Sequence, residues 1–329
     1  MKILYLTTKE TEHLADDLLY GLRKVLGGDV VDWPKKRSLY AASRDVLNVS
    51  RDHGLGFNCF GLTEDPCDRR DIYAKLVTGY FDWVVNSSCW RIQSPLHPRL
   101  IAVDGEDHPM LNQVYLRVAA HYFKGELPLP QPGISPLLFS LPDHLAPTAR
   151  HKKDTEILSS FMIAQHQPWE TSCAHIRVEL ARAFPPKHFD SVGSYLNAID
   201  RAWFMLSPKG FGWDCPRHYE ALGRAIPCIQ TGPGAAYDLD FYFKDGRNCV
   251  TFETVAELKK KLKEPMDREA MLERGRWDLF NYHLSSKRAE QFLTVLEGLG
   301  ERSAFASDAQ RATWAAFFGA AHHAQPVGA

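Results

Sequence analysis

Short apolar runs alternate with amphipathic stretches along the first half of the chain. Runs typical of buried strands occur at residues 2–6, 29–33, 81–88 and 99–103. Residues 11–26 and 69–80 have the spacing of helices, and Gly27 and Gly28 end the first of them. Strands that are joined through helices by short connections predict a parallel sheet covered by helices.

The same alternation begins again after a connection rich in proline. Residues 127–147 contain six prolines, too many for a regular helix, and a basic linker follows at residues 150–154. Further strands are predicted at residues 156–164, 204–207, 226–230 and 248–252. Further helices are predicted at residues 170–184, 194–201, 254–263, 267–281, 286–299 and 308–321.

This repetition predicts two Rossmann-like α/β domains, over residues 1–148 and 149–284. The remaining residues, 285–329, are expected to form C-terminal helices that pack back on the first domain. Trp314, Phe317 and Phe318 give the last of these helices an apolar face, either for that contact or for docking a partner.

Composition excludes several classes of protein. A length of 329 residues with 45% hydrophobic residues is enough for two buried cores. A net charge of −1 argues against broad electrostatic capture of nucleic acid. The seven cysteines contain no C-x-x-C pair and are expected to be reduced thiols. No run approaches the roughly 18 apolar residues of a membrane span, and the first apolar run is too short for a signal peptide, so a cytoplasmic location is expected.

A glycine-rich turn between two predicted strands carries the candidate binding chemistry. The strand that ends at Ser207 leads into a turn with Lys209, Gly210 and Gly212, and a helix opens near Pro216. The glycines let backbone N–H groups approach an anion, and Lys209 adds positive charge. The turn therefore predicts a phosphate site, in which Ser207 acts either as a ligand or as a turn former.

Arg217 and Glu220 follow on the predicted helix, three residues apart, where one ligand can meet both side chains. A cation and a carboxylate suit a ligand with phosphate at one end and a sugar diol at the other. The alternative is an exposed ion pair between the two. Gly232 and Gly234, after the next strand, offer a second phosphate contact or a tight turn. Trp213 either stacks on a base or belongs to the core.

An acidic group follows the strand at residues 99–103. Asp104, Glu106, Asp107 and His108 lie where parallel strands place ligands, at a carboxyl end. Three functions are open: a general base, a hard-oxygen site for Mg²⁺ or Mn²⁺, or caps of a helix that begins near Pro109. As a base, Asp104 and Asp107 come first and Glu106 next.

The glycine-rich segment resembles a known family signature. Its residues are Ser207-Pro-Lys-Gly-Phe-Gly, then Asp214-x-x-Arg217-x-x-Glu220-Ala-Leu-Gly, then Ile226-Pro227. This pattern is similar to the donor-domain motif of glycosyltransferases with the GT-B fold. It is most similar to that of the exostosin-type branch and its bacterial relatives. This sequence departs from it by one extra residue after Gly223 and by Cys228 in the usual valine place. The match covers roughly residues 203–235.

The resemblance implies two domains that face a central cleft, with the acceptor on the first and the donor on the second. It implies that Lys209 and Arg217 neutralise the donor pyrophosphate and that Glu220 binds the ribose. The acidic group, Asp104, Glu106 and Asp107, would then face the cleft from the acceptor side. No obligatory metal cofactor is expected, because the two cations serve the leaving diphosphate.

The predicted function is transfer of a sugar from a nucleotide diphosphate sugar to a hydroxyl acceptor, which is a glycan, a small molecule or, with less support from the charge, a nucleic acid base. A sugar epimerase or phosphorylase on the same scaffold is one alternative. A catalytically silent nucleotide-binding protein of this fold is another.

Overall fold

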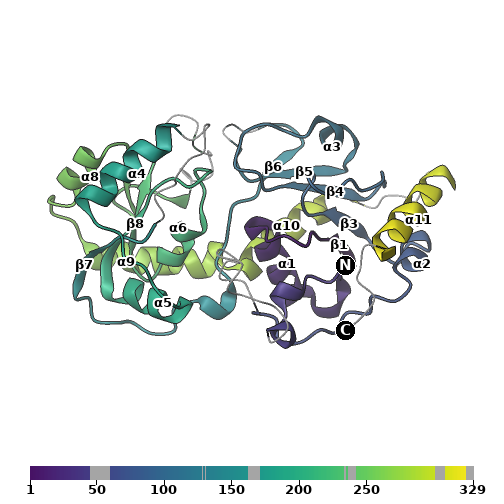
Figure 1. Ribbon diagram of the computed structural model, residues 1–329, viewed down its shortest axis with the longest axis horizontal. Coiled ribbons are helices and arrows are strands. Elements are labelled where there is room, and N and C mark those ends of the chain that lie inside the picture. The colour runs from purple at the N-terminus through teal and green to yellow at the C-terminus, as the bar shows by residue number, and fades with distance from the viewer. Residues whose placement is uncertain are drawn as a thin grey trace.

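The computed structural model describes residues 1–44, 60–127, 129, 131–161, 171–232, 235, 242–300 and 308–323. Two parallel sheets lie side by side in it, each with helices against it (Figure 1). The first sheet belongs to the N-terminal part of the chain and the second to the C-terminal part.

The first sheet has the strand order β2-β1-β3-β4-β5-β6, and all neighbouring strands are parallel. The strands are β1 Ile3–Leu6, β2 Val30–Trp33, β3 Trp83–Asn86, β4 Leu100–Asp104, β5 His121–Lys124 and β6 Ile134–Pro136. Its connections contain α1 His13–Leu26, α2 Ile72–Val77 and α3 Gln113–Val118. Short 3₁₀ turns occur at η1 Gly27–Asp29, η2 Arg37–Leu39, η3 Ala41–Ser43 and η5 Asp143–Leu145. The order reverses between β1 and β3, which is where open α/β sheets bind ligands.

The second sheet has the order β10-β9-β8-β7 and is also parallel. Its strands are β7 Thr155–Leu158, β8 Ala202–Ser207, β9 Ile226–Gln230 and β10 Val250–Phe252. The helices of this part are α4 Thr171–Ala183, α5 Val192–Arg201, α6 Pro216–Ala221, α8 Val255–Lys261 and α9 Arg268–Asp278. Thr254 caps α8 by accepting a hydrogen bond from the Glu257 N–H at 3.2 Å.

Alternate residues of β1 enter two different cores, as the period of a strand requires. Ile3 and Tyr5 pack in the core that contains residues of α1 and α10. Leu4 and Leu6 pack on the other face, with residues of α2 and α11. Because both faces of the sheet are covered, its strands are continuously apolar, which is the pattern seen in the sequence.

The C-terminal helices pack on the first domain. They are a π-helical turn, η6 Leu279–His283, then α10 Ser285–Gly298 and α11 Asp308–His323. Helix α10 contacts α1, and α11 contacts α2 (Figure 1). Gly21 permits the first contact, because a Cβ atom there would lie 1.9 Å from the Ser285 carbonyl oxygen. The indole N–H of buried Trp314 donates to the Leu96 carbonyl oxygen at 3.1 Å.

The predicted fold class is confirmed, and individual elements differ from the pattern. Strand β6 lies within the proline-rich connection, where Pro136 ends the strand at the sheet edge. Helix α2 is shorter than expected and begins at Ile72. The domain limits at residues 148 and 284 stay a prediction. No helix in the described ranges has the length and hydropathy to cross a membrane.

Candidate active site

The glycine-rich turn of the second domain meets the acidic group of the first. The Asp214 N–H donates to Glu126 Oε1 at 2.9 Å, and the Phe139 N–H donates to Asp214 Oδ2 at 2.7 Å. A Cβ atom on Gly212 would lie 2.3 Å from Glu126 Oε1 and 2.8 Å from Asp107 Oδ1. The two predicted halves of the site are thus in direct contact across the domain interface.

Asp107 and Glu126 are a pair of carboxyl groups with altered acidity. Desolvation of the carboxyl group, and then the nearby charge of Glu126, raise the pKa of Asp107 to about 7, although the residue as a whole is exposed. Burial and the charge of Asp214 raise the pKa of Glu126 to about 7. A carboxylate that gains or loses a proton near neutral pH is suited to general base chemistry.

Sequence reasoning did not select Glu126. It follows the C-terminal end of β5, and β5 pairs with β4, whose end carries the acidic group. The carboxyl ends of neighbouring parallel strands share one edge of a sheet. A charged residue just after β5 was therefore available as a signal, but Glu126 stood out only once a strand was recognised at His121–Lys124, and the sequence pattern predicted none there.

Asp104 is fully buried and surrounded by hydrogen-bond donors. Its Oδ1 accepts from Lys124 Nζ at 3.0 Å, and its Oδ2 accepts from Trp90 Nε1 at 2.9 Å and from the Tyr122 hydroxyl. Lys124 is equally buried and also donates to the Glu106 carbonyl oxygen at 2.7 Å. These contacts give Asp104 a structural role at the edge of the sheet, and Asp107 is the stronger candidate for the base.

The other two interpretations of the acidic group have less support in this geometry. Lys124 already provides the positive charge beside Asp104, and Arg91 Nε lies 3.4 Å from Glu106 Oε1. The helix expected near Pro109 begins later, at Gln113, and Asn112 caps it. The acidic group therefore does not cap that helix.

Replacing Asp104 with Asn should strongly destabilise the protein. The change leaves Lys124 as an uncompensated buried charge, which costs about 3–5 kcal/mol of unfolding free energy. Urea denaturation followed by circular dichroism measures this. Glu106→Gln, which alters a partly exposed ion pair, should cost less than about 1 kcal/mol. Equal effects of the two substitutions would contradict the structural role of Asp104.

The hydroxyl group of Ser207 is engaged inside the second domain. His218 Nε2 lies 2.9 Å from the Trp213 carbonyl oxygen and must donate to it, so His218 Nδ1 accepts from Ser207 Oγ at 2.7 Å. Both Ser207 and His218 are fully buried. This arrangement favours the turn-forming role of Ser207 over a phosphate ligand.

Lys209 and the glycines form the surface of the turn. The Lys209 ammonium lies 4.4 Å from the centre of the Trp213 ring, and its backbone N–H donates to Gln230 Oε1 at 3.2 Å. The Gly210 N–H donates to the Gly212 carbonyl oxygen at 2.9 Å, which closes the turn. A Cβ atom on Gly232 would lie 2.9 Å from the Trp213 ring. Gly234 lies outside the described residues.

Arg217 and Glu220 do not form the exposed ion pair that was the alternative. Arg217 Nη1 lies 3.4 Å from the Pro208 carbonyl oxygen, and no carboxylate in the described ranges is within ion-pair distance of it. Glu220 is only 4% exposed, accepts a hydrogen bond from the Tyr195 hydroxyl at 2.6 Å, and has a pKa raised by burial. Arg217 therefore keeps donors for a ligand beside Lys209.

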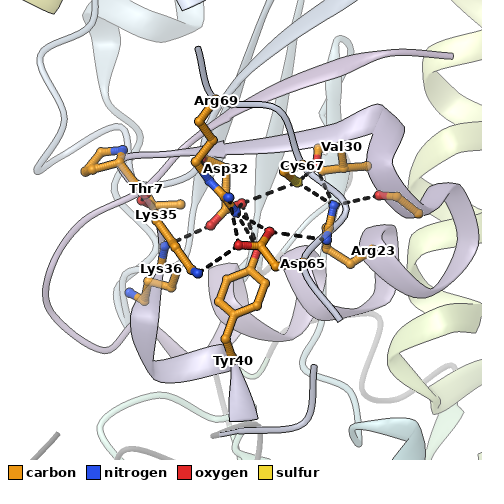
Figure 2. Close-up of polar contacts among 12 residues, drawn as sticks. Thr7, Arg23, Val30, Asp32, Lys35, Lys36, Tyr40, Asp65, Cys67 and Arg69 are labelled. Carbon is orange, nitrogen blue, oxygen red and sulfur yellow. Dashed lines mark hydrogen bonds and ion pairs between the residues drawn. The ribbon is translucent and has the colours of Figure 1, made fainter. Parts of the chain in front are cut away.

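A second polar cluster supports the first domain and resembles a metal site. Asp32, Asp65 and Cys67 bring their ligand atoms close together. Figure 2 shows that cations already occupy the space between them. Lys35 Nζ lies 2.7 Å from Asp65 Oδ2, and Arg69 Nη2 pairs with both carboxylates. The cluster therefore joins β2 to the later loop through these partly buried ion pairs.

Comparison with known proteins supports the same fold. Residues 196–294 match a family model described as glycosyl transferase-like, over less than a third of the chain. A crystal structure of Anabaena HepE with UDP and glucose covers 91% of this chain and 100% of its own, at 10% identity and a TM-score of 0.52. The match to a glycosyltransferase structure from Rickettsia africae covers 92% of this chain and 99% of that protein, at 8% identity and a TM-score of 0.55. This chain has the GT-B fold.

The resemblance to GT-B glycosyltransferases is therefore confirmed at the level of the fold, and the exostosin-type branch has no support among the matches. No curated protein matches the sequence significantly. The matched family segment begins in α5 and ends in α10, so it includes the turn with Lys209, Gly210 and Gly212.

Proposed function

We propose that this protein is a glycosyltransferase that moves a sugar from a nucleotide diphosphate sugar to a hydroxyl acceptor. The observation that carries the proposal is the contact between the Lys209–Asp214 turn and the carboxyl pair Asp107 and Glu126. Cations for a diphosphate lie on one side of this contact, and a group able to accept a proton lies on the other. The glycosyl transferase-like segment at residues 196–294 contains the cationic side.

A uridine nucleotide is the donor we favour. Structures of Anabaena HepE contain UDP with glucose, UDP alone, or UDP-glucose. In this chain, Lys209 and Arg217 would bind the diphosphate and Glu220 the ribose hydroxyl groups. Gly210, Gly212 and Gly232 would allow the backbone to approach the phosphates, and Gly234 stays a candidate for the same role.

The chemistry follows from these positions. The acceptor oxygen attacks the anomeric carbon of the sugar, and the bond from that carbon to the diphosphate oxygen breaks. The Asp107 carboxylate takes the proton of the acceptor hydroxyl group. Lys209 and Arg217 balance the charge that develops on the leaving diphosphate. No metal ion is required for this balance.

The conformation described here requires opening before substrates enter. Gly212 lies directly against Glu126 and Asp107, and the cavity beside Glu220, which His13 and Pro216 also line, measures about 10 Å³. A small-molecule site needs roughly 300 Å³ or more. Movement of the two domains about their connections would separate Gly212 from the carboxyl pair and admit the donor.

Titration of the purified protein with UDP and GDP tests the proposal. We expect a dissociation constant of about 1 mM or tighter for at least one of them, measured by calorimetry or by the rise in melting temperature. Absence of binding by every nucleoside diphosphate would refute it. Incubation of a bound sugar nucleotide with and without acceptors then separates transfer from epimerisation and from binding alone.

A further inference from the structure

We infer that the second domain carries a separate anion-binding site for the phosphate group of a small phosphorylated molecule. An open cavity of about 460 Å³ lies between the domain linker, the start of β8 and helix α9. Trp203 and Arg224 line it and precede or begin strands, so it lies at the amino-terminal edge of the second sheet. The Lys209 turn follows the opposite, carboxyl end of β8. The cavity is therefore distinct from the proposed donor site and does not depend on it.

The lining of the cavity has an excess of positive charge. Five arginine and lysine side chains line it: Arg150, Lys152, Lys153, Arg224 and Arg276. Three carboxylates line it as well: Asp200, Glu269 and Glu273. Arg224 Nη1 lies 2.7 Å from Asp200 Oδ2, and Arg150 Nη2 lies 2.5 Å from Glu273 Oε2. These two ion pairs leave three cations and one carboxylate on the lining.

Two of the remaining cations are fixed in place but not neutralised. Lys153 Nζ donates to the Asp200 carbonyl oxygen at 2.8 Å and to the Arg224 carbonyl oxygen, and Arg276 Nη2 donates to the Pro147 carbonyl oxygen at 3.1 Å. Neither forms an ion pair with a carboxylate in the part of the chain described. Carbonyl groups orient a cation without cancelling its charge, so both are prepared for an anion.

A buried donor of Arg224 points to the same conclusion. This residue is 7% exposed, and its Nε–H has no acceptor among the described residues. An unsatisfied buried donor is costly, and Arg224 brings this unpaired N–H to the wall of the cavity. Burial also lowers the pKa of Lys153 to about 8, although the charges of Asp200 and Glu269 act in the opposite direction.

The shape of the cavity selects the ligand class. Trp203 and Leu272 supply an apolar wall beside the cations. The volume falls in the range of roughly 300–1,000 Å³ that is typical of small-molecule sites. A phosphate group attached to a ring or to an apolar body would satisfy both parts of the lining, either as a free metabolite or as the head group of a lipid.

Calorimetric titration of the full chain with phenyl phosphate tests this site. Arg276→Gln should weaken binding about tenfold or more, because a hydrogen bond to a charged group contributes about 1.5–3 kcal/mol. Lys152→Glu, an exposed change at the rim, should weaken binding too and covers the case in which Arg276→Gln does not fold. The matched control Lys259→Glu changes an exposed lysine of α8 outside the cavity and should have no effect.

Two further arms distinguish the source of the phosphate and the site that binds it. Vesicles of phosphatidylglycerol should be bound in place of phenyl phosphate if the ligand is a lipid, with the same loss in Arg276→Gln. Arg217→Ala, on the donor side, should leave either interaction unchanged. The inference is overturned if neither probe binds, or if Arg217→Ala weakens binding while Arg276→Gln and Lys152→Glu do not.

Discussion

Replacing Asp107 with Asn should reduce the rate of sugar transfer about 100- to 10,000-fold, the range that a general base contributes. Asn keeps the size of the side chain but cannot accept the proton of the acceptor hydroxyl group. Donor affinity should change little, because Lys209 and Arg217 hold the diphosphate. Steady-state kinetics on the variant, with UDP binding measured separately, tests both statements.

Glu106→Gln is the matched control, since Glu106 lies beside Asp107 in the same loop and pairs with Arg91. It should retain most of the activity. If Asp107→Asn keeps full activity while Glu106→Gln loses it, the assignment of the base is wrong. If both variants fold normally and both lose activity, catalysis depends on both carboxylates of this loop.

The pH dependence of transfer gives an independent test of the pair. The base must be deprotonated, and the pKa of Asp107 is raised to about 7, so kcat should increase as the pH rises through about 7. Glu126→Gln removes the nearby negative charge but keeps an oxygen acceptor for the Asp214 N–H. The pKa of Asp107 should fall, and the kcat profile should move to lower pH. An unmoved profile would show that Glu126 does not act on the base.

Replacing Arg217 with Ala should weaken UDP binding about 10- to 100-fold, because a hydrogen bond to a charged group contributes about 1.5–3 kcal/mol. The prediction follows from the absence of a carboxylate partner for Arg217 in the described structure, which leaves its donors for the diphosphate. Calorimetric titration with UDP measures the change. Binding should also weaken with rising salt concentration, because the contact is between charges.

Arg247→Ala is a suitable control for this experiment. Arg247 is an exposed arginine of the same domain whose guanidinium lies 3.5 Å from Asp278 Oδ1. Its loss should leave UDP binding unchanged. If the two substitutions have equal effects on binding, Arg217 has no specific contact with the nucleotide.

The sequence alone determined the two parallel sheets and the turn that joins β8 to α6. Strand and helix periods are local properties, and continuously apolar strands such as β4 are expected only where helices cover both faces. The glycines and Lys209 are adjacent in the chain, so their chemistry could be recognised without knowing the fold. The resemblance to GT-B glycosyltransferases depends on the same short segment.

Only the tertiary structure decided which side chains of that site are available. The sequence offered Asp104 and Asp107 equally as candidates for the base. Their different hydrogen bonding comes from Lys124, Trp90 and Tyr122, which, of these two carboxylates, donate only to Asp104. The choice of Glu126 as the partner of Asp107 likewise depends on the pairing of β4 with β5 and on the close approach of Gly212 from the other domain. Burial and acidity are set by residues distant in the chain, and no local pattern carries that information.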